Sequence, residues 1–276
     1  MNEKEGEFLG REQTPLKYLI WEPSEGNIKA EIIAFHDWWT TSKKFEAFAE
    51  YITDKGYRLY GMDLRGHGKN TLGHKGHIES METLIKDIVL FMDSIKNKEK
   101  EKKIFLLGNS FGGLVALRYA IAHPLLDGVI AVSPLLDLKI KIPGAKKLAK
   151  KLKRNPAAMI SYEIDQKFLT SDLKILKQYL ADKDRLKSIS VKSYSDMQDA
   201  MKEVLSGASG LLCSVFILQA GNEKIVNKSK VKKFYEKIKS EDKNYKEYDL
   251  FLHDLMAEKM RAQVFQDIYI WLEKHL

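Results

Sequence analysis

The sequence predicts an α/β fold, with a mostly parallel central sheet flanked by helices and a helical cap inserted between two strands. Three observations lead to this prediction: short apolar runs typical of buried strands, amphipathic helical patterns between them, and one long interval without a strand-like run. Strands and helices that alternate in this way form βαβ units, whose parallel sheet is covered on both faces. With 276 residues, 44% of them hydrophobic, the chain can bury a sizeable core, which excludes a disordered protein.

Each predicted strand is a short run with a largely apolar middle. The strands of the parallel sheet are expected at 29–36, 57–63, 103–108, 128–133 and 214–219, with a further strand at 245–250. The run 17–21 is expected to add an antiparallel strand at the edge of this sheet. Amphipathic helical patterns lie between the strands, at 43–55, 79–97, 111–123, 227–240 and 255–275.

The interval from 135 to 210 breaks this alternation. It contains only helix-like segments, which are divided by Pro143, Pro156 and a Ser-rich stretch near 188–195. We expect it to form a helical cap over the C-terminal edge of the sheet, where ligands bind in open α/β sheets. The chain would then consist of a core, 1–134 and 211–276, and a cap, 135–210.

Several classes of protein are excluded by what the sequence lacks. Its single cysteine, Cys213, excludes a disulfide framework and a cysteine-based metal cluster. No apolar run approaches the roughly 18 residues needed to span a bilayer, and the N-terminus lacks the layout of a signal peptide, so we expect a cytoplasmic protein. His74 and His77 lack a well-placed third ligand, and no phosphate-binding loop or dinucleotide motif is present, so we expect neither a metal nor a cofactor.

The segment from Gly108 to Gly112 fits the pattern G-x-S-x-G, with Ser110 at its centre. A predicted strand runs directly into the motif and a helical pattern follows it, which is the setting of a nucleophile elbow. The sharp turn strains the central residue, small flanking residues let neighbouring chains approach, and the serine oxygen is expected to be exposed. The alternative is a glycine-rich turn that contains a serine by chance.

Four blocks of sequence resemble the α/β-hydrolase superfamily, in the branch of monoacylglycerol lipases and lysophospholipases that is often grouped with serine aminopeptidases. The blocks span nearly the whole chain, from about 17 to 275, and lie at 36–38, 63–68, 108–113 and 219–226, the last joined by the later His253. The resemblance implies a serine nucleophile, an acid and a histidine in that chain order. It also implies that block 63–68, Asp-Leu-Arg-Gly-His-Gly, has a structural role.

The resemblance assigns the base and the acid of a catalytic triad. His253 follows a predicted strand, where this family places its base, whereas His275 ends the last helical pattern and is expected to be a surface group. Glu223 stands where the family has an aspartate, and glutamate occurs in some versions of the triad. Asp249 and Asp254 remain alternatives for the carboxylate.

The resemblance also assigns two backbone donors for an oxyanion hole, the N–H groups of Phe111 and Trp38. Asp37 replaces a glycine of the family beside Trp38, and we expect its side chain to face outward or to cap the helix near residue 43. Trp38, Trp39 and Phe111 are expected to wall the acyl pocket, although the two tryptophans could also be part of the core.

These assignments imply an enzyme that hydrolyses a small-molecule acyl ester, such as a monoacylglycerol or a lysophospholipid, through an acyl-enzyme formed on Ser110. An acyl-thioesterase, an aminopeptidase and a non-catalytic ligand-binding member of the same fold remain alternatives. An aminopeptidase needs an acidic anchor for the substrate ammonium, and the basic cap argues against one. We expect no binding of nucleic acid, because the chain lacks a recognised nucleic-acid fold.

The net charge of +8, from 46 Lys and Arg against 38 Asp and Glu, is concentrated in one segment of the predicted cap. Segment 139–154 holds eight basic residues: Lys139, Lys141, Lys146, Lys147, Lys150, Lys151, Lys153 and Arg154. Apolar residues recur at helical spacing between them, which predicts a basic amphipathic helix that could contact an anionic membrane peripherally. The alternative is a solvated cap helix packed on the core, and the oligomeric state is left open.

Overall fold

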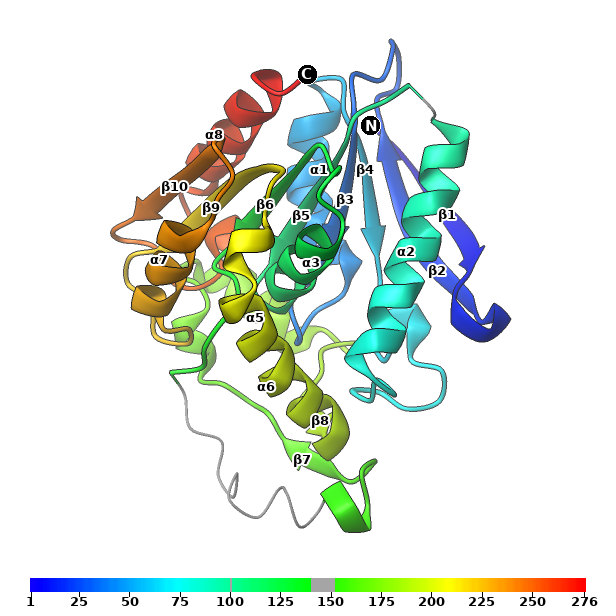
Figure 1. Cartoon of the computed structure of the whole chain (residues 1–276), viewed down its shortest axis with the longest axis vertical. Helices are drawn as coiled ribbons and strands as arrows, with labels where there is room; N and C mark the ends of the chain where they lie inside the picture. The colour runs from blue at the N-terminus through cyan, green and yellow to red at the C-terminus, as the bar shows by residue number, and fades with distance from the viewer. Residues whose placement is uncertain (100, 140–151) are drawn as a thin grey trace.

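A computed structural model describes residues 1–99, 101–139 and 152–276 of the chain (Figure 1). In this part, eight strands form one sheet in the order β1-β2-β4-β3-β5-β6-β9-β10. Their bounds are β1 Asn2–Leu9, β2 Pro15–Glu22, β3 Glu31–Phe35, β4 Arg58–Met62, β5 Ile104–Asn109, β6 Gly128–Val132, β9 Ser214–Ala220 and β10 Lys243–Tyr248. The pairs β1–β2 and β2–β4 are antiparallel and the other five are parallel, so the predicted mostly parallel sheet is confirmed.

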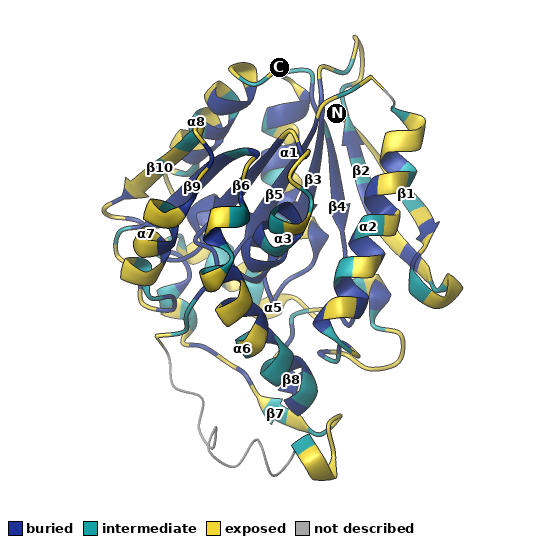
Figure 2. Cartoon of the chain, viewed as in Figure 1, coloured by how far each residue is buried: buried dark blue, intermediate teal, exposed yellow. Residues whose placement is uncertain are grey.

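Helices cover both faces of the sheet, whose inner strands are buried between them, whereas the edge strands β1 and β10 are largely exposed (Figure 2). Successive side chains of a strand point to opposite faces, so Ile33 of β3 belongs to one core cluster and Ile32 to the other. The helices α2, α3 and α7 pack on the first cluster and α1 and α8 on the second. Their bounds are α1 Glu46–Thr53, α2 Met81–Lys98, α3 Phe111–Ala122, α7 Lys228–Lys237 and α8 Arg261–Glu273.

The edge of the sheet differs from the prediction. The run 17–21 lies within β2, but this strand is second from the edge, and the unpredicted strand β1 lies outside it. In β1 only Phe8 is buried, so its polar residues gave no strand signal in the sequence. The strand pairs along its whole length with β2, and Glu3 accepts a hydrogen bond of 2.7 Å from the indole of Trp21.

The segment between β6 and β9 also contains strands that were not predicted. β7, Met159–Ser161, and β8, Ser188–Ser190, form an antiparallel pair, and helices α5, Leu173–Ala181, and α6, Val191–Ser206, accompany them. The expectation that 135–210 contains no strand is therefore wrong, because strands of three residues are too short to form an apolar run. The division into core and cap stays a prediction.

Two helical patterns begin with tighter turns than expected. Residues 42–45 and 255–257 form short 3₁₀ turns, so α1 and α8 begin later than the helices predicted at 43–55 and 255–275. Within the three described ranges, no helix combines the length and the apolar character needed to cross a bilayer. The cytoplasmic location stays a prediction.

Candidate active site

Ser110 lies at a sharp turn between a strand and a helix. β5 ends at Asn109 and α3 begins at Phe111, so Ser110 alone reverses the chain, with φ 53° and ψ −110°. A positive φ strains a residue that has a side chain, and such strain must be held by its surroundings. Here the main-chain N–H of Ser110 donates to the carbonyl of Val132 (2.9 Å), and its carbonyl accepts from Leu135 N–H (2.9 Å).

Two glycines make this turn sterically possible. A Cβ atom on Gly112 would lie 1.9 Å from the carbonyl oxygen of Phe35, at the end of β3, and one on Gly108 would lie 2.3 Å from the carbonyl oxygen of Gly112. Real Cβ atoms do not approach other atoms so closely, which explains why both positions need glycine. The first contact also shows that the start of α3 lies directly against the end of β3.

The structure brings Ser110, His253 and Glu223 together. Nε2 of His253 lies 2.8 Å from Oγ of Ser110, and Nδ1 lies 2.8 Å from Oε2 of Glu223. Glu223 follows β9 and His253 follows β10, so three parallel strands deliver the three side chains to one edge of the sheet. Ser110 is buried rather than exposed as expected, because the loops after β3, β6 and β10 pack around it.

Burial and charge act in opposite directions on this chain of hydrogen bonds. Burial by itself lowers the pKa of His253, but the Glu223 carboxylate and, in smaller measure, Asp254 and Asp37 raise it above its ordinary value. Burial likewise raises the pKa of Glu223, but His253 and the N–H groups of Ile225 and Val226 bring it below its ordinary value. The glutamate is therefore ionised and accepts from Nδ1–H, which leaves Nε2 free to accept from the serine hydroxyl.

The other histidine and the other carboxylates lie elsewhere. Asp249 is exposed, and the carboxylate of Asp254 bonds to Lys44 and Tyr179 instead of His253. His275 interacts with Asp242 (2.6 Å) at the far end of the chain. Among the alternatives that the sequence left open, only Glu223 contacts His253.

The two predicted oxyanion donors share a position beside the nucleophile. Phe111 N–H starts α3, and Trp38 N–H lies in the loop after β3, which touches the start of α3. Neither N–H donates to an acceptor within residues 1–99, 101–139 and 152–276. Their rings pack edge to face with centroids 5.1 Å apart. Both N–H groups are therefore without partners in these ranges, and their role as an oxyanion hole stays a prediction.

The expectation for Asp37 is wrong. Its side chain is buried, and it neither faces outward nor caps the helix near residue 43. Oδ1 accepts from the N–H groups of Trp39 (2.8 Å) and Thr40 (3.1 Å), a turn that aspartate favours. Burial raises the pKa of Asp37, but Lys44 outweighs this effect and lowers the pKa to about 2. The carboxylate points inward because a buried ammonium is present to compensate it.

The predicted pocket residues Trp38, Trp39 and Phe111 are buried at the contact with the segment between β6 and β9. The Trp39 ring stacks on Tyr162 with centroids 5.4 Å apart, and its indole N–H donates to the Tyr162 carbonyl (2.8 Å). Leu186 N–H donates to the Trp39 carbonyl (3.1 Å). These contacts hold the loop after β3 against the segment between β6 and β9, and the role of the three side chains in substrate binding stays a prediction.

The block 63–68 supports this loop. Arg65 forms two hydrogen bonds with the buried Asp87 of α2 (2.7 and 3.0 Å), and Nε2 of His67 lies 3.0 Å from the Trp38 carbonyl. The carboxylate of Asp63 accepts from the N–H and hydroxyl of Ser42 (2.8 and 2.7 Å). The block thus holds neighbouring loops and is not part of the triad.

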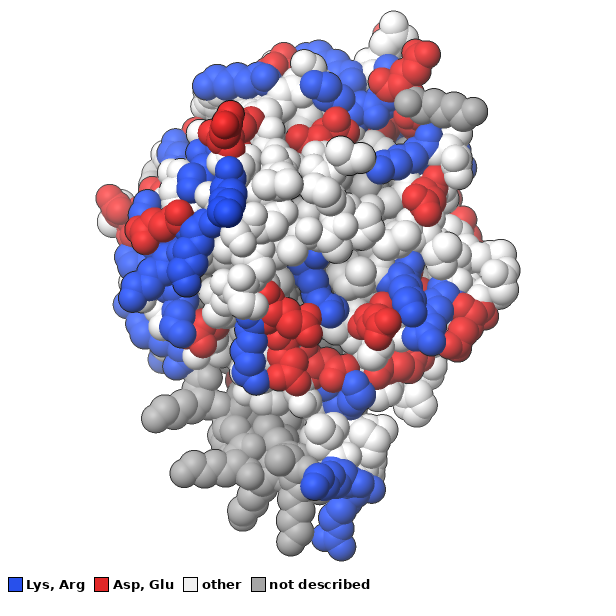
Figure 3. All heavy atoms as spheres, in the orientation of Figure 1, with Lys and Arg blue, Asp and Glu red and all other residues white. Residues whose placement is uncertain are grey.

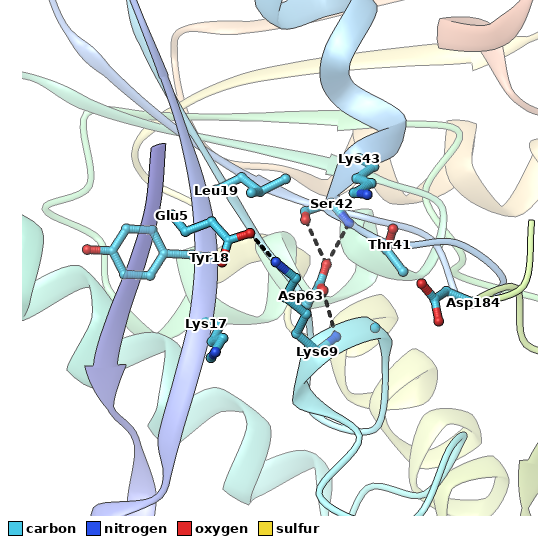
Figure 4. Close-up of a pocket in the computed structure, with 11 residues that line it drawn as sticks. Glu5, Lys17, Tyr18, Leu19, Thr41, Ser42, Lys43, Asp63, Lys69 and Asp184 are labelled. Carbon is cyan, nitrogen blue, oxygen red and sulfur yellow. Dashed lines mark hydrogen bonds and ion pairs between the residues drawn. The ribbon is translucent and has the colours of Figure 1, made fainter. Parts of the chain in front are cut away.

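A small surface pocket of about 50 Å³ lies beside this block (Figure 4). In the close-up, Asp63 points toward Ser42 and the main chain of Lys69, and Lys69 pairs with Glu5. None of Ser110, Glu223 and His253 lines this pocket, and its acids already have partners: Asp63 and Glu5 through these contacts, and Asp184 through Lys75. It is therefore separate from the candidate active site.

A family comparison decides where this fold belongs. Residues 26–260 match the family described as serine aminopeptidase, S33. The chain belongs to this family. The predicted resemblance to the monoacylglycerol lipase and lysophospholipase branch of the α/β-hydrolases is confirmed by this family match and by relatives named monoglyceride lipase, monoacylglycerol lipase and phospholipase.

The relatives of this S33 family member cover nearly its whole length. Phospholipase YtpA of Bacillus subtilis is 26% identical over 262 residues, which cover 93% of this chain and 100% of the relative. Human monoglyceride lipase is 24% identical over 276 residues, covering 92% and 85% of the two chains. The crystal structure of a Paleococcus ferrophilus monoacylglycerol lipase aligns with a TM-score of 0.78 and 26% identity over all of both chains.

A second solved structure supports the assignment of the fold. A soluble variant of monoglyceride lipase from Saccharomyces cerevisiae, solved with a substrate analogue, aligns with a TM-score of 0.84 at 22% identity, covering 95% of this chain and 92% of the other. The α/β-hydrolase fold predicted from the sequence is therefore confirmed.

The sequence did not identify three further residues at this site: Lys44, Tyr162 and Tyr179. Lys44 is one of two adjacent lysines at the start of a helical pattern, and nothing local distinguishes it from the exposed Lys43. Its one signal was indirect, because an aspartate in place of the family glycine at position 37 requires a compensating cation if it is buried.

Proposed function

We propose that the chain hydrolyses single-chain acyl esters, such as monoacylglycerols or lysophospholipids, through a triad of Ser110, His253 and Glu223. The observation that carries this proposal is the pair of 2.8 Å contacts that joins the strained serine to the histidine and the histidine to the carboxylate. The broader class of ester hydrolase agrees with the family and with relatives named as lipases and a phospholipase. The choice of substrate and the role of each residue are part of the proposal.

In the proposed mechanism, Nε2 of His253 takes the hydroxyl proton while Oγ of Ser110 attacks the ester carbonyl. Glu223 remains ionised and holds Nδ1–H, which stabilises the imidazolium that forms. The negative charge on the former carbonyl oxygen is stabilised by the N–H groups of Phe111 and Trp38. His253 then gives the proton to the departing alcohol, and the acyl-enzyme is hydrolysed by a water that His253 deprotonates.

The experiment that tests the function compares the wild type with Ser110→Ala. Both are offered p-nitrophenyl esters of rising chain length, a monoacylglycerol, a lysophospholipid and amino-acid p-nitroanilides. We expect ester turnover by the wild type and a loss on the order of 10⁴-fold or more in kcat for the variant. Wild-type turnover no higher than that of Ser110→Ala on every ester would refute the hydrolase, and turnover of the anilides alone would favour an aminopeptidase.

Glu223 is tested by replacing its charge and its length separately. Glu223→Gln is expected to lower kcat by about 10⁴-fold, because an amide no longer holds the productive tautomer of His253. Glu223→Asp keeps the charge and restores the family residue, so we expect it to retain far more activity than Glu223→Gln. Full activity in Glu223→Gln would show that another group orients the base.

We also propose that the basic segment 139–154 contacts an anionic lipid surface. The segment contributes all of the net charge, since the remaining 38 Lys and Arg equal the 38 Asp and Glu of the chain. Most of it, 140–151, lies outside the described residues, so the proposal rests on charge and sequence pattern.

A further inference from the structure

Lys44 is a buried cation held between three loops of the candidate active site. It lies in the short turn Ser42–Phe45, and only 2% of its side chain is exposed. Its Nζ atom lies 2.5 Å from Oδ2 of Asp37, 2.7 Å from Oδ1 of Asn109 and 3.0 Å from Oδ2 of Asp254. Three contacts use the three donors that an ammonium group has.

Each of these three partners is the chain neighbour of a residue in the proposed machinery. Asp37 precedes Trp38, the second oxyanion donor, and Asn109 precedes Ser110. Asp254 follows His253. Asp37 and Asp254 lie in the loops after β3 and β10, and Asn109 is the last residue of β5, so one ammonium connects the proposed oxyanion loop, the nucleophile turn and the base loop.

The network contains two carboxylates and one cation. Asp37 and Asp254 are both buried, and a buried carboxylate without a compensating charge costs several kcal/mol. Tyr179 of α5 donates its hydroxyl to Oδ2 of Asp254 (2.6 Å), which joins the network to the segment between β6 and β9. Asp37 has further donors in its own loop, but within the described ranges Lys44 is the only cation that contacts either carboxylate.

We propose that Lys44 is a positioning residue of the proposed ester hydrolysis, which holds the three loops in register and cancels the negative charge of Asp37 and Asp254 beside the forming oxyanion. This inference rests on the proposed function, because it concerns the same reaction. Lys44 does not touch the substrate and acts through the residues next to Trp38, Ser110 and His253.

Because charged groups surround His253, the positioning role of Lys44 has a measurable effect on the pH–rate profile. The groups that face the imidazole or its partners are Glu223, Asp254, Asp37, Lys44 and the hydroxyl of Tyr179. Removal of the ammonium leaves both aspartates to stabilise the imidazolium, so the acid limb of the pH–rate profile moves to higher pH, by about one unit. Removal of one aspartate moves the acid limb to lower pH. A purely structural lysine would change the amount of active enzyme and leave the position of the limb unchanged.

The test compares four variants of the full chain with the wild type, using a neutral p-nitrophenyl ester. Lys44→Met removes the ammonium, and Lys43→Met, an exposed lysine in the same turn, is the matched control. Asp254→Asn removes one carboxylate and leaves Lys44 paired with Asp37. The triple variant Lys44→Met/Asp37→Asn/Asp254→Asn removes all three charges with little change in shape. A fluorophosphonate titration counts the reactive serines in each preparation.

We expect Lys44→Met to lose about 10²–10³-fold in kcat per titrated serine, with a smaller change in KM, and to shift the acid limb upward. Lys43→Met should stay within about twofold of the wild type. The triple variant should recover at least about tenfold of the loss and return the limb toward its wild-type position. Asp254→Asn, which leaves no unpaired buried charge, should fold and shift the limb downward, so the inference is tested even if Lys44→Met does not fold.

Two outcomes would overturn the inference. Wild-type kcat and an unmoved acid limb in Lys44→Met would show that Lys44 has no positioning role, and so would an unmoved limb in Asp254→Asn. Both differ from failure of the proposed function, in which the wild type itself turns over esters no faster than Ser110→Ala.

Discussion

His253 combines burial with two charged neighbours in a way that determines how the site responds to pH. The imidazole must be neutral to accept the serine proton, yet Glu223 favours its protonated form. The ionised glutamate is fixed by two backbone N–H groups of its own loop, from Ile225 (2.7 Å) and Val226 (3.1 Å). The orientation of the base is therefore set by a carboxylate that cannot easily turn away.

This arrangement predicts the pH dependence of the reaction. Because the pKa of His253 is raised, kcat/KM for a neutral ester should rise with pH through a midpoint above the ordinary value of about 6.5 and level off beyond it. The same shift acts oppositely on folding: its stabilising effect is fully present below the unfolded pKa and is lost as pH rises through the folded pKa. A profile of kcat/KM with a midpoint at or below 6.5 would contradict this, and Glu223→Gln should lower the midpoint.

At the scale of elements, the site depends on how closely α3 approaches β3. The helix begins directly at the end of β5, and its first turn packs on the carbonyl groups of Phe35 and His36 through Gly112. This approach brings the start of α3 against the end of β3, and these two places carry the two proposed oxyanion donors. The turn at Ser110 therefore matters as much for the packing of α3 against β3 as for the direction of the chain.

Replacement of Gly112 tests this packing. In Gly112→Ala the new methyl group would collide with main-chain atoms that cannot move independently, so we expect the free energy of unfolding to fall by at least about 3 kcal/mol. The corresponding fall in Tm is about 6 °C or more. Gly210→Ala is the matched control, because its Cβ would meet a methyl group of Ile121 at 3.3 Å and the Ile121 carbonyl oxygen at an ordinary contact distance of 3.7 Å. Equal thermal melts of the two variants would contradict the argument.

At the scale of the whole molecule, charge is unevenly distributed. Figure 3 shows lysine side chains gathered over α7, where Lys230, Lys232, Lys233 and Lys237 are exposed. The basic segment 139–154 also begins beside this helix. Leu138, the residue before the segment, pairs with Val226, which lies just before α7. The chain therefore has two basic regions, of which only 139–154 lacks acids of its own.

A matched pair of variants distinguishes these regions in lipid binding. One variant neutralises four lysines of the basic segment and the other neutralises four of α7, all to glutamine: Lys146, Lys147, Lys150 and Lys151 against Lys230, Lys232, Lys233 and Lys237. With about 1 kcal/mol for each lysine near an anionic surface, we expect the first variant to lose on the order of 10³-fold in affinity for phosphatidylserine vesicles. The second should lose less than about tenfold, and wild-type binding should weaken with salt. A larger loss of affinity in the second variant than in the first would show that α7 makes the contact with the lipid.

The sequence by itself determined the alternation of strands and helices, the turn at Ser110 and the place of His253. These features depend on local sequence. A buried parallel strand, a glycine-flanked turn and an amphipathic helix can each be recognised from about ten consecutive residues. The mostly parallel sheet and the resemblance to the family followed from them, whereas the order of the strands did not. The strand at 2–9 was not predicted, because an edge strand of polar residues has no apolar pattern.

Only the tertiary structure decided which carboxylate meets His253 and where Asp37 points. The resemblance favoured Glu223 but left Asp249 and Asp254 open, and the structure shows that Glu223 contacts the imidazole. Lys44 and Asp254 are 210 positions apart, so their contact depends on the parallel sheet, which brings the loops after β3 and β10 to the same edge. A buried charge network is a property of that packing, because burial makes each charge require a partner that distant segments must supply.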